Sequence, residues 1–423
     1  MTTGSGSQRT VHILALILAG EAIFFLPFVI SRVFRPTFLE VFGLTNFQLG
    51  TLFSVYGTVA MIAYFPGGLL ADRLEARKLL GLALGLTALG GMMWLRVPDL
   101  GAMKGLYAYW GLTTILLFWA ALIRATREWG GDATQGLAFG LLDGGRGLFT
   151  AVMGTLMVAV FAWLLPGDVE QVSPEEKEAA FRSVIFVYGI LVVVVAAFVW
   201  FALPRTGAKS EERVLHASWV GIREVIALPT VWLQALILIC AYIGFQSTND
   251  FSLLAQDALE LDEVEAAKVG TISLWMRPLA AILGGVLADR YGSIRMTLIS
   301  FGCLLIGSVA IALGILQPGG IMVFAVIVIT TSAGIFALRG LYYAIMQEGN
   351  VPMALTGSAV GVVSVIGYTP DIFMGPWMGH LLDVSPGELG HQHVFALVAG
   401  FAAIGGAATM AYGRLARGMG QRG

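Results

Sequence analysis

The stretch Gly68-Leu-Leu-Ala-Asp72-Arg73 occurs a second time, with one residue changed, as Gly285-Val-Leu-Ala-Asp289-Arg290. Each copy closes one long apolar run and leads into the next. A basic residue follows each copy at the same spacing, Lys78 in the first half and Arg295 in the second. This repeat predicts that one bundle of membrane-spanning helices is used twice in the chain, an arrangement typical of transporters.

The composition excludes a soluble globular enzyme and a nucleic-acid-binding protein. Of the 423 residues, 57% are hydrophobic and only 12% are charged, and the mean hydropathy is +0.82. Soluble domains carry about 25% charged residues, so this chain cannot cover a surface that faces water. The formal net charge is -2 and the sequence holds no basic tract, so no nucleic-acid partner is expected.

Apolar segments of about twenty residues, each long enough to cross a bilayer, fill both halves of the chain. They lie at about 11–31, 47–71, 79–96, 104–124, 134–165, 183–203, 230–256, 264–288, 295–316, 320–345, 356–380 and 393–414. The polar stretch Pro204 to Leu228 separates the two sets. We therefore expect an all-α integral membrane protein of twelve transmembrane helices in two six-helix pseudo-repeats, residues 1–203 and 229–423, joined by a cytoplasmic linker at 204–228.

The distribution of positive charge predicts the orientation. If the N-terminus is cytoplasmic, alternate loops and the linker hold most of the lysine and arginine residues outside the spans. Cytoplasmic loops of membrane proteins carry such an excess. We expect a multi-pass protein of the cell inner membrane, surrounded by lipid, with both termini in the cytoplasm.

The repeated motif has the form Gly-xxx-Asp-Arg-x-Gly-x-Arg/Lys-Arg/Lys and stands between the second and third helices of each half. In this respect the chain resembles the major facilitator superfamily of transporters over its whole length. Two departures are visible: Glu75 replaces the motif glycine in the first copy, and Ser293-Ile294 precede Arg295 where basic residues are usual. The resemblance implies a twelve-helix carrier that works by alternating access.

The resemblance also implies that charged residues of the motif act as a cytoplasmic gate, holding the cytoplasmic ends together in the outward-open state. The gating residues are Asp72, Arg73, Arg77, Asp289, Arg290 and Arg295, and Glu128 at the end of the fourth helix is a further candidate. A carboxylate and a guanidinium across two loops can pair in one state and separate in the other. The alternative is that they form ordinary surface pairs, each worth about 0–1 kcal/mol.

Within that family the chain is similar to the branch of sugar-phosphate permeases and organophosphate:phosphate antiporters. The similar segments are Arg124-xx-Arg127-Glu-Trp129, Phe38-Leu39-Glu40 and Asp250-Phe251-Ser252. The two arginines that bind phosphate in the branch correspond here to Val29 and Phe245, which argues against a phosphate antiporter of the usual kind. The central histidine of the branch matches Arg146, and Arg32, one turn beyond Val29, is a candidate substitute.

Ionised residues inside the spans are the informative ones, because each costs at least about 2.5–3.5 kcal/mol unless it faces the bundle interior or water. They are Glu21, Asp143, Arg146, Arg277 and Asp371. Arg277 has no charged residue within a turn, so we expect a partner on another helix, a carbonyl freed by Pro278, or a ligand. The resemblance places Arg146 and Arg277 at one central cavity, where two guanidiniums favour a carboxylate, sulfonate or phosphate.

Alternatives stay open for several of these residues. Asp143 and Arg146 lie three apart on one helix face and can neutralise each other. Glu21 is the candidate proton-coupling group, or else a permanent partner of Arg146 or Arg277. Asn249 and Tyr368, with Gln246 and Asp250, offer hydrogen bonds to substrate hydroxyls or to loosened backbone. We further expect Arg339 to mirror Arg124 at the cytoplasmic face, and His391 and His393 to lie in an exposed loop.

The expected function is secondary active transport of a small organic anion, such as a carboxylate, sulfonate or sugar-phosphate-like molecule. A proton or a counter-anion would drive it. The candidate substrate-binding residues are Glu21, Asp143, Arg146, Asn249, Arg277, Tyr368 and Asp371. Two other functions remain open, a drug/proton antiporter for lipophilic cations and a membrane sensor that binds its ligand without carrying it. No cofactor, metal site or catalytic residue is expected.

Overall fold

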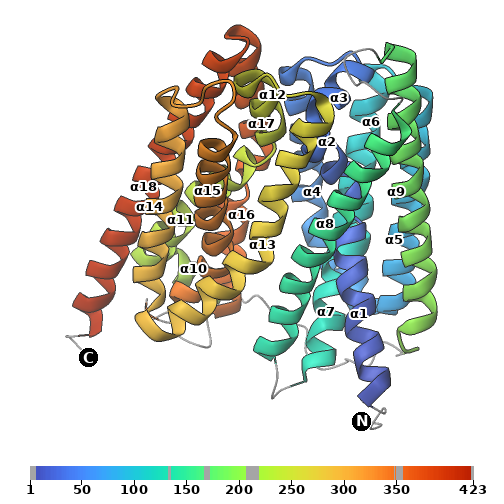
Figure 1. The fold of residues 1–423 in the computed structure, drawn as a ribbon. Helices are drawn as coiled ribbons and strands as arrows, with labels where there is room; N and C mark the ends of the chain where they lie inside the picture. The colour runs from blue at the N-terminus through green and yellow to red at the C-terminus, as the bar shows by residue number, and fades with distance from the viewer. Residues whose placement is uncertain are drawn as a thin grey trace.

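The computed structural model describes residues 6–131, 135–165, 172–205, 219–346, 348 and 356–420, and this part of the chain forms helices and no strand. Within it, 12 helical segments are long and apolar enough to cross a membrane. They stand side by side in one bundle (Figure 1). The prediction of an all-α protein with twelve transmembrane helices is confirmed.

The first half contains α1 (Gly6–Ala22), the π-helical turn η1 (Phe25–Val29), α2 (Ile30–Val33), α3 (Arg35–Val41), α4 (Asn46–Arg73), α5 (Ala76–Gly91), η2 (Met92–Arg96), α6 (Leu100–Gly111), the π-helical η3 (Leu112–Trp119), α7 (Ala120–Gly130), α8 (Gln135–Leu164) and α9 (Pro174–Ala202). The second half contains α10 (Trp219–Ile226), α11 (Pro229–Ser247), α12 (Phe251–Leu259), α13 (Glu263–Tyr291), α14 (Ser293–Ala312), α15 (Ile321–Leu341), η5 (Ala344–Met346), α16 (Thr356–Gly367), α17 (Pro370–Val384) and α18 (Glu388–Gly420).

Local sequence signals explain where several of these helices begin. Thr45 and Gln48 form a capping box at the start of α4, and Ser173 and Glu176 form another at the start of α9. Such boxes satisfy backbone N–H groups that the first helical turn leaves without partners. The predicted seventh span is wrong in extent, because α11 stops at Ser247 and α12 is a separate helix. Hydrogen bonds of the i to i+3 type from residues 248–250 tighten the chain there into a turn.

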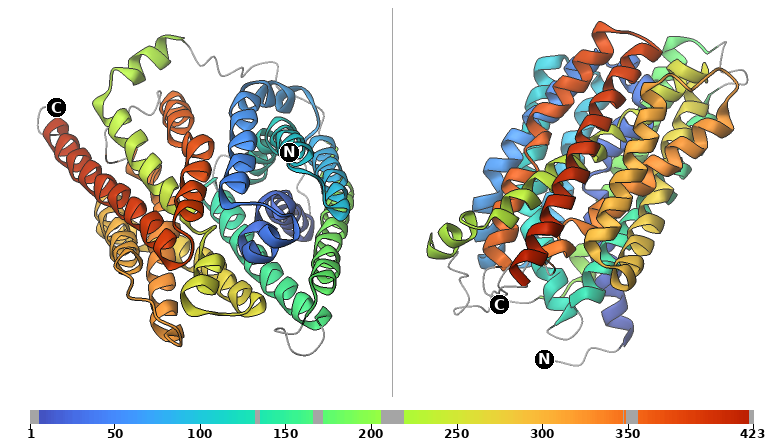
Figure 2. Two further views of the ribbon diagram at one scale, coloured as in Figure 1. Left: turned by 90° about the horizontal axis from the view of Figure 1, so that it is seen from above. Right: turned by 90° about the vertical axis from the view of Figure 1, so that its left-hand side faces the viewer.

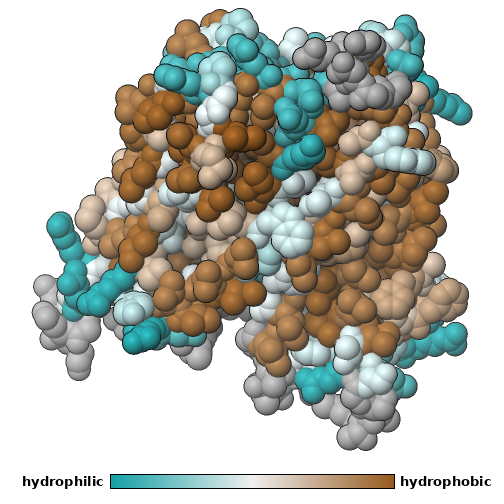
Figure 3. Space-filling view, in the orientation of Figure 1, coloured by the Kyte–Doolittle hydropathy of each residue, from teal (hydrophilic) through white to brown (hydrophobic). Residues whose placement is uncertain are grey.

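The helices form two groups, each with its own apolar core. Figures 1 and 2 show α1 to α9 on one side of the molecule and α11 to α18 on the other. The fully buried Phe25, Trp94 and Phe181 belong to the first core, and Phe251 and Phe395 to the second. The outer surface carries a broad apolar belt between two polar ends, as expected of a protein surrounded by lipid (Figure 3). Most of the expected linker, residues 206–218, lies outside the described residues.

The two ends of the bundle differ. We call the end where α1 begins and α18 ends the termini end, and the opposite one, where α4 begins, the far end. Figure 3 shows a hollow between the two groups at the termini end, whereas the far end is closed. There α4 and α17 touch so closely that a Cβ atom on Gly50 would lie 2.1 Å from the carbonyl oxygen of Gly375. Only glycine fits this approach.

Polar contacts between the halves reinforce the closed far end. The carboxylate of Asp383, in the second half, accepts hydrogen bonds from the backbone N–H groups of Asn46 at 3.0 Å and Phe47 at 2.8 Å. These two groups open α4 in the first half, where a helix attracts a negative charge. Lys177 of α9 lies 2.6 Å from Glu263 of α13. The far end is therefore held by matched groups from both halves.

Candidate functional site: a charged centre between the two halves

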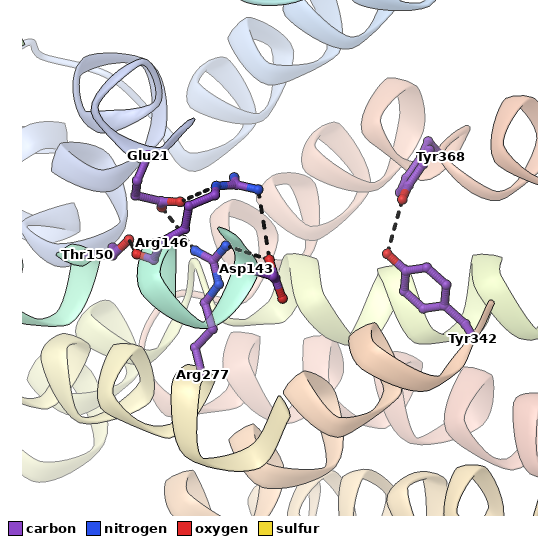
Figure 4. A network of polar contacts seen from close by, with 7 residues as sticks. All are labelled: Glu21, Asp143, Arg146, Thr150, Arg277, Tyr342 and Tyr368. Atoms are coloured by element: carbon purple, nitrogen blue, oxygen red, sulfur yellow. Dashed lines mark hydrogen bonds and ion pairs between the residues drawn. The ribbon is translucent and has the colours of Figure 1, made fainter. Parts of the chain in front are cut away.

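Glu21 of α1 lies at the middle of the bundle and binds two arginines. Its Oε2 atom accepts a hydrogen bond from Nε of Arg146 on α8 at 3.1 Å, and its Oε1 atom accepts one from Nη1 of Arg277 on α13 at 3.0 Å. All three side chains are buried, with 5% of Glu21 and 9% of each arginine exposed. The cross-helix partner expected for Arg277 is therefore a carboxylate (Figure 4).

Asp143 of α8 completes the network on its exposed side. Its Oδ1 atom lies 3.4 Å from Nη2 of Arg277 and 3.9 Å from Nη1 of Arg146, and 44% of its side chain is exposed. The helical pair Asp143–Arg146 is thus the longest contact of the four, because Glu21 takes the Nε atom of Arg146. Arg277 belongs to the second half, and Glu21 and Asp143 to the first, so these ion pairs join the halves at the centre of the bundle.

Arg339 corrects a prediction. It does not mirror Arg124, which donates to the carbonyl of Leu74 near the termini end. Instead, the guanidinium carbon of Arg339 lies 4.0 Å from the ring centroid of Phe245 on α11. The guanidinium carbon of Arg32 lies 4.9 Å from the same centroid. A long side chain near a helix end can reach into the bundle, and sequence position alone does not reveal where its charge lies.

Arg32 and Arg339 differ from Arg146 and Arg277 in their partners. Nε of Arg32 donates to Oδ1 of Asn249 at 2.7 Å. Among the described residues, neither Arg32 nor Arg339 has a carboxylate oxygen within 4.0 Å. Phe245 is thus the aromatic surface on which both guanidiniums rest. An arginine on an aromatic face gains about 0.5–2 kcal/mol while its N–H donors stay free for an anion.

Asp371 at the start of α17 is surrounded by neutral groups. The hydroxyl of Tyr242 donates to its two carboxylate oxygens at 2.9 and 3.1 Å, and Nε2 of Gln246 donates to Oδ1 at 2.6 Å. Tyr242 and Gln246 lie four apart on one face of α11. Gln246 was named from the sequence and Tyr242 was missed, although the spacing of these two polar residues in an apolar helix could have indicated both.

A group of tyrosines lies beside Asp371. The hydroxyl of Tyr368 is 3.1 Å from that of Tyr342 (Figure 4), and the hydroxyl of Tyr343 is 2.7 Å from Oγ of Ser364. Each hydroxyl can donate or accept, so the group can adapt to a hydroxylated ligand. The structure therefore brings Glu21, Asp143, Arg146 and Arg277 together between the two halves. It places Tyr368 and Asp371 in a second group, which lies within the second half.

Asn249 and Asp250 lie toward the far end. The backbone carbonyl of Asn249 accepts from Nη1 of Arg35 at 3.3 Å. Asp250 is fully buried against His391, with 2.7 Å between its Oδ2 and the ring Nδ1. Burial raises the pKa of Asp250, but the neighbouring charges of His391 and Arg35 outweigh it and hold that pKa below its usual value.

The prediction of an exposed loop for His391 and His393 is wrong. Both residues lie in α18, His393 exposed and His391 completely buried. Nε2 of His391 lies 3.0 Å from Oδ2 of Asp257, so the ring joins two carboxylates. The partners stand 141 and 134 residues away in sequence, which is why the short-range pattern gave no sign of them. In the part of the chain that the structure describes, no three His, Cys, Asp or Glu residues are placed to hold a metal.

The predicted gating residues lie at the termini end. Arg73, Asp289, Arg290 and Arg295 are exposed, while the side chain of Asp72 lies outside what the structure describes. Arg77 pairs with Glu75 at 3.1 Å and Glu128 with Arg124 at 3.4 Å, both within the first half. Among the described side chains, no ion pair joins the two halves at this end. This arrangement matches the hollow between them.

The sequence profile of the Major Facilitator Superfamily matches residues 17–376. The inner membrane protein YqcE of Escherichia coli (strain K12) is 24% identical over 410 residues, covering 94% of this chain and 92% of YqcE. The nitrate/nitrite transporter NarU of Salmonella typhimurium is 23% identical over 295 residues, 63% of this chain and 61% of NarU. A bacterial homolog of the human lysosomal transporter Spinster, solved in an inward-facing and unoccupied conformation, has a TM-score of 0.71 and 16% identity, covering 97% of this chain and 98% of that chain. The chain belongs to the Major Facilitator Superfamily and is a multi-pass membrane protein of that transporter family.

Proposed function

We propose that this protein is a secondary active transporter that moves a small organic anion by alternating access, driven by a proton or a counter-anion. One observation carries the proposal. Arg32, Arg146, Arg277 and Arg339 approach one another between the halves, and the described residues give Arg32 and Arg339 no carboxylate within 4.0 Å. Arg32 is buried and Arg339 is half-buried, and a guanidinium inside the bundle without a carboxylate favours an anionic ligand, such as a carboxylate, sulfonate or sugar-phosphate-like group.

The ion pairs of Arg277 suggest how substrate and conformation are linked. In the present state Arg277 joins the halves through Glu21 and Asp143. An anion that reaches Arg277 or Arg146 competes with these carboxylates, so binding changes the contacts between the halves. A ligand shifts a conformational equilibrium only by such differential contacts. Residues 1–203 and 229–423 would then move as two units about the linker.

The names of two relatives support an anionic substrate and a location in the inner membrane. NarU carries the name of a nitrate/nitrite transporter, and YqcE that of an inner membrane protein. We place this chain in the inner membrane with both termini cytoplasmic, so the hollow opens to the cytoplasm. The charges of the repeated motif would then meet only when the cytoplasmic end closes.

The test is thermal stabilisation of the purified protein by a panel of carboxylates, sulfonates, sugar phosphates, neutral sugars and lipophilic cations. A ligand at one hundred times its Kd adds about 2.7 kcal/mol, which a melting curve resolves. We expect one class of anion to raise Tm, and Arg339→Gln to abolish the rise. A rise with lipophilic cations alone would contradict the proposal and favour drug/proton antiport.

A matched control separates the arginines of the centre from positive charge in general. Arg96 lies at the end of η2, outside the charged centre. Arg96→Gln removes the same charge, and we expect it to leave the anion-dependent rise in Tm intact. An equal loss in both variants would mean that the anions act through the overall charge of the protein.

A further inference from the structure

The carboxylates at the middle of the bundle have opposite kinds of surroundings. Glu21 binds two guanidiniums at 3.1 and 3.0 Å, and Asp143 lies 3.4 Å from one of them. Among the described residues, the side chain of Asp371 receives hydrogen bonds only from the neutral groups of Tyr242 and Gln246. Among the described residues no cationic nitrogen lies within 4.0 Å of Asp371. An ionised carboxylate without a cation in such a place is costly, and it reaches neutrality by taking up a proton.

The groups that face Asp371 can serve both of its protonation states. Tyr56 and Tyr64 face it from α4, Tyr242 from α11 and Arg339 from α15, all close enough to interact with its charge. When Asp371 is ionised, the hydroxyl of Tyr242 donates to it. When it is protonated, its own O–H can donate to the Tyr242 oxygen after that hydroxyl rotates. The Tyr242 hydroxyl can therefore pair with the carboxyl of Asp371 in either state.

Asp371 also lies at the seam that must open when the far end opens. A Cβ atom on Gly57 of α4 would lie 2.7 Å from Cβ of Asp371 and 2.9 Å from its carbonyl oxygen. The backbone and Cβ atom of Asp371, in one half, thus rest directly on the backbone of Gly57 in the other. Separation of α4 from α17 would bring water to Asp371 from the far side, so a proton could enter from one side and leave to the other.

We propose that Asp371, rather than Glu21, is the proton-carrying residue of the transport cycle. This inference rests on the proposed function only in that it assigns the coupling ion. The step is one proton joining a carboxylate oxygen on one side of the membrane and leaving it on the other, with no other bond changed. Glu21, held by two guanidiniums, stays ionised and serves as the central tie between the halves.

The test needs no substrate. Infrared difference spectra of the purified wild type in lipid, recorded against pH, should contain the carbonyl stretch of a protonated carboxyl that disappears as the pH rises. We expect the band to be absent in Asp371→Asn and present in Glu21→Gln. A band that persists in Asp371→Asn, or a wild type that has none, would overturn the inference.

Two further variants keep the test decisive if Asp371→Asn is poorly folded. Asp371→Glu retains a carboxyl and should retain the band, shifted in frequency. Tyr242→Phe removes a donor that stabilises the ionised form, so the midpoint of the band should move to higher pH. An unchanged midpoint in Tyr242→Phe would assign the band to another carboxyl.

Transport then separates this inference from the proposed function. In liposomes, a pH gradient should drive uptake of the stabilising anion by the wild type and fail to do so in Asp371→Asn. If the wild type carries no anion while the infrared band is present and lost in Asp371→Asn, the anion proposal fails and the proton site stands. If gradient-driven uptake survives in Asp371→Asn, the proton site fails and the anion proposal stands.

Discussion

The far end and the termini end both hold charged and polar groups, yet these groups pair differently at the two ends. At the far end, Asp383 of one half caps α4 of the other, and Lys177 pairs with Glu263 across the halves. At the termini end, the described ion pairs, such as Arg77–Glu75 and Arg124–Glu128, stay within one half. Inter-half pairing at one end only is what a carrier stopped in one state of its cycle is expected to have.

The charged centre of the bundle lies between these two ends. We expect a substitution there to have the largest effect on stability and on the contact between the halves. Replacing Arg277 by Gln leaves Glu21 with one guanidinium and Asp143 without its nearer one. Breaking a buried ion pair costs about 3–5 kcal/mol. We expect a large fall in Tm, measured in detergent, and weaker contact between the halves. Asp143→Asn is the matched control, because 44% of the Asp143 side chain is exposed and its loss should cost far less. Equal losses would contradict the network.

The glycine contact at the far end comes next. In Gly50→Ala the added Cβ would overlap the backbone of Gly375, and overpacking of this kind costs about 1–3 kcal/mol. The far end should open, so the distance between spin labels at Met93 and Leu389 should increase. Both positions are exposed and lie at the far end of opposite halves. Gly85→Ala, whose Cβ would meet no atom within 4 Å, should leave that distance unchanged.

Loss of the helix cap that Asp383 provides across the halves should open the far end less than the steric overlap in Gly50→Ala. Asp383→Ala removes both acceptors from the start of α4, and a lost cap costs about 0.5–2 kcal/mol. The population with the far end open should rise about two- to thirtyfold in the same spin-label measurement. Asp99→Ala removes a cap of α6 that stays within the first half. It should lower Tm without changing the distance, and a change there would mean that any lost cap opens the far end.

Charges at the open termini end should have the smallest effect on the present state. Asp289→Asn removes an exposed carboxylate, so the free energy of unfolding should change by no more than about 0.5 kcal/mol. Tm should therefore stay nearly the same. If Asp289 helps to close the termini end in the other state, the variant should populate that closed state less. The share of short distances between labels at Leu74 and Tyr291 should then be smaller in the variant than in the wild type. The same distance distribution in variant and wild type, with transport intact, would make Asp289 an ordinary surface charge.

The sequence supported some features strongly and others not at all, for physical reasons. The repeated motif and the apolar runs predicted the twelve helices, and the cost of burying Arg277 predicted a partner on another helix, a carbonyl freed by Pro278, or a ligand. The stacking of Arg339 on Phe245 and the burial of His391 between Asp250 and Asp257 were not predicted. These contacts join helices more than 90 residues apart. Periodicity describes one helix at a time, so it cannot say which charged tips meet.

The break after Ser247 shows a second reason. Residues 248–256 were predicted to continue the seventh span, yet three local hydrogen bonds turn the chain, and Oδ2 of Asp250 pairs with the buried His391. A polar residue near a span end has the same sequence signature whether water or a distant histidine satisfies it. Here a tertiary contact decided between the two.

The central claim, that the arginines between the halves carry an anion across the membrane, has one most direct test. The anion that raises Tm most would be loaded into liposomes containing the protein, and exchange of labelled anion from outside would be measured for the wild type and Arg339→Gln. A hydrogen bond to a charged group is worth about 1.5–3 kcal/mol, so exchange at low anion concentration should fall about 10- to 100-fold in the variant. A wild type that binds the anion without exchanging it, or an Arg339→Gln variant that exchanges it equally well, would contradict the account.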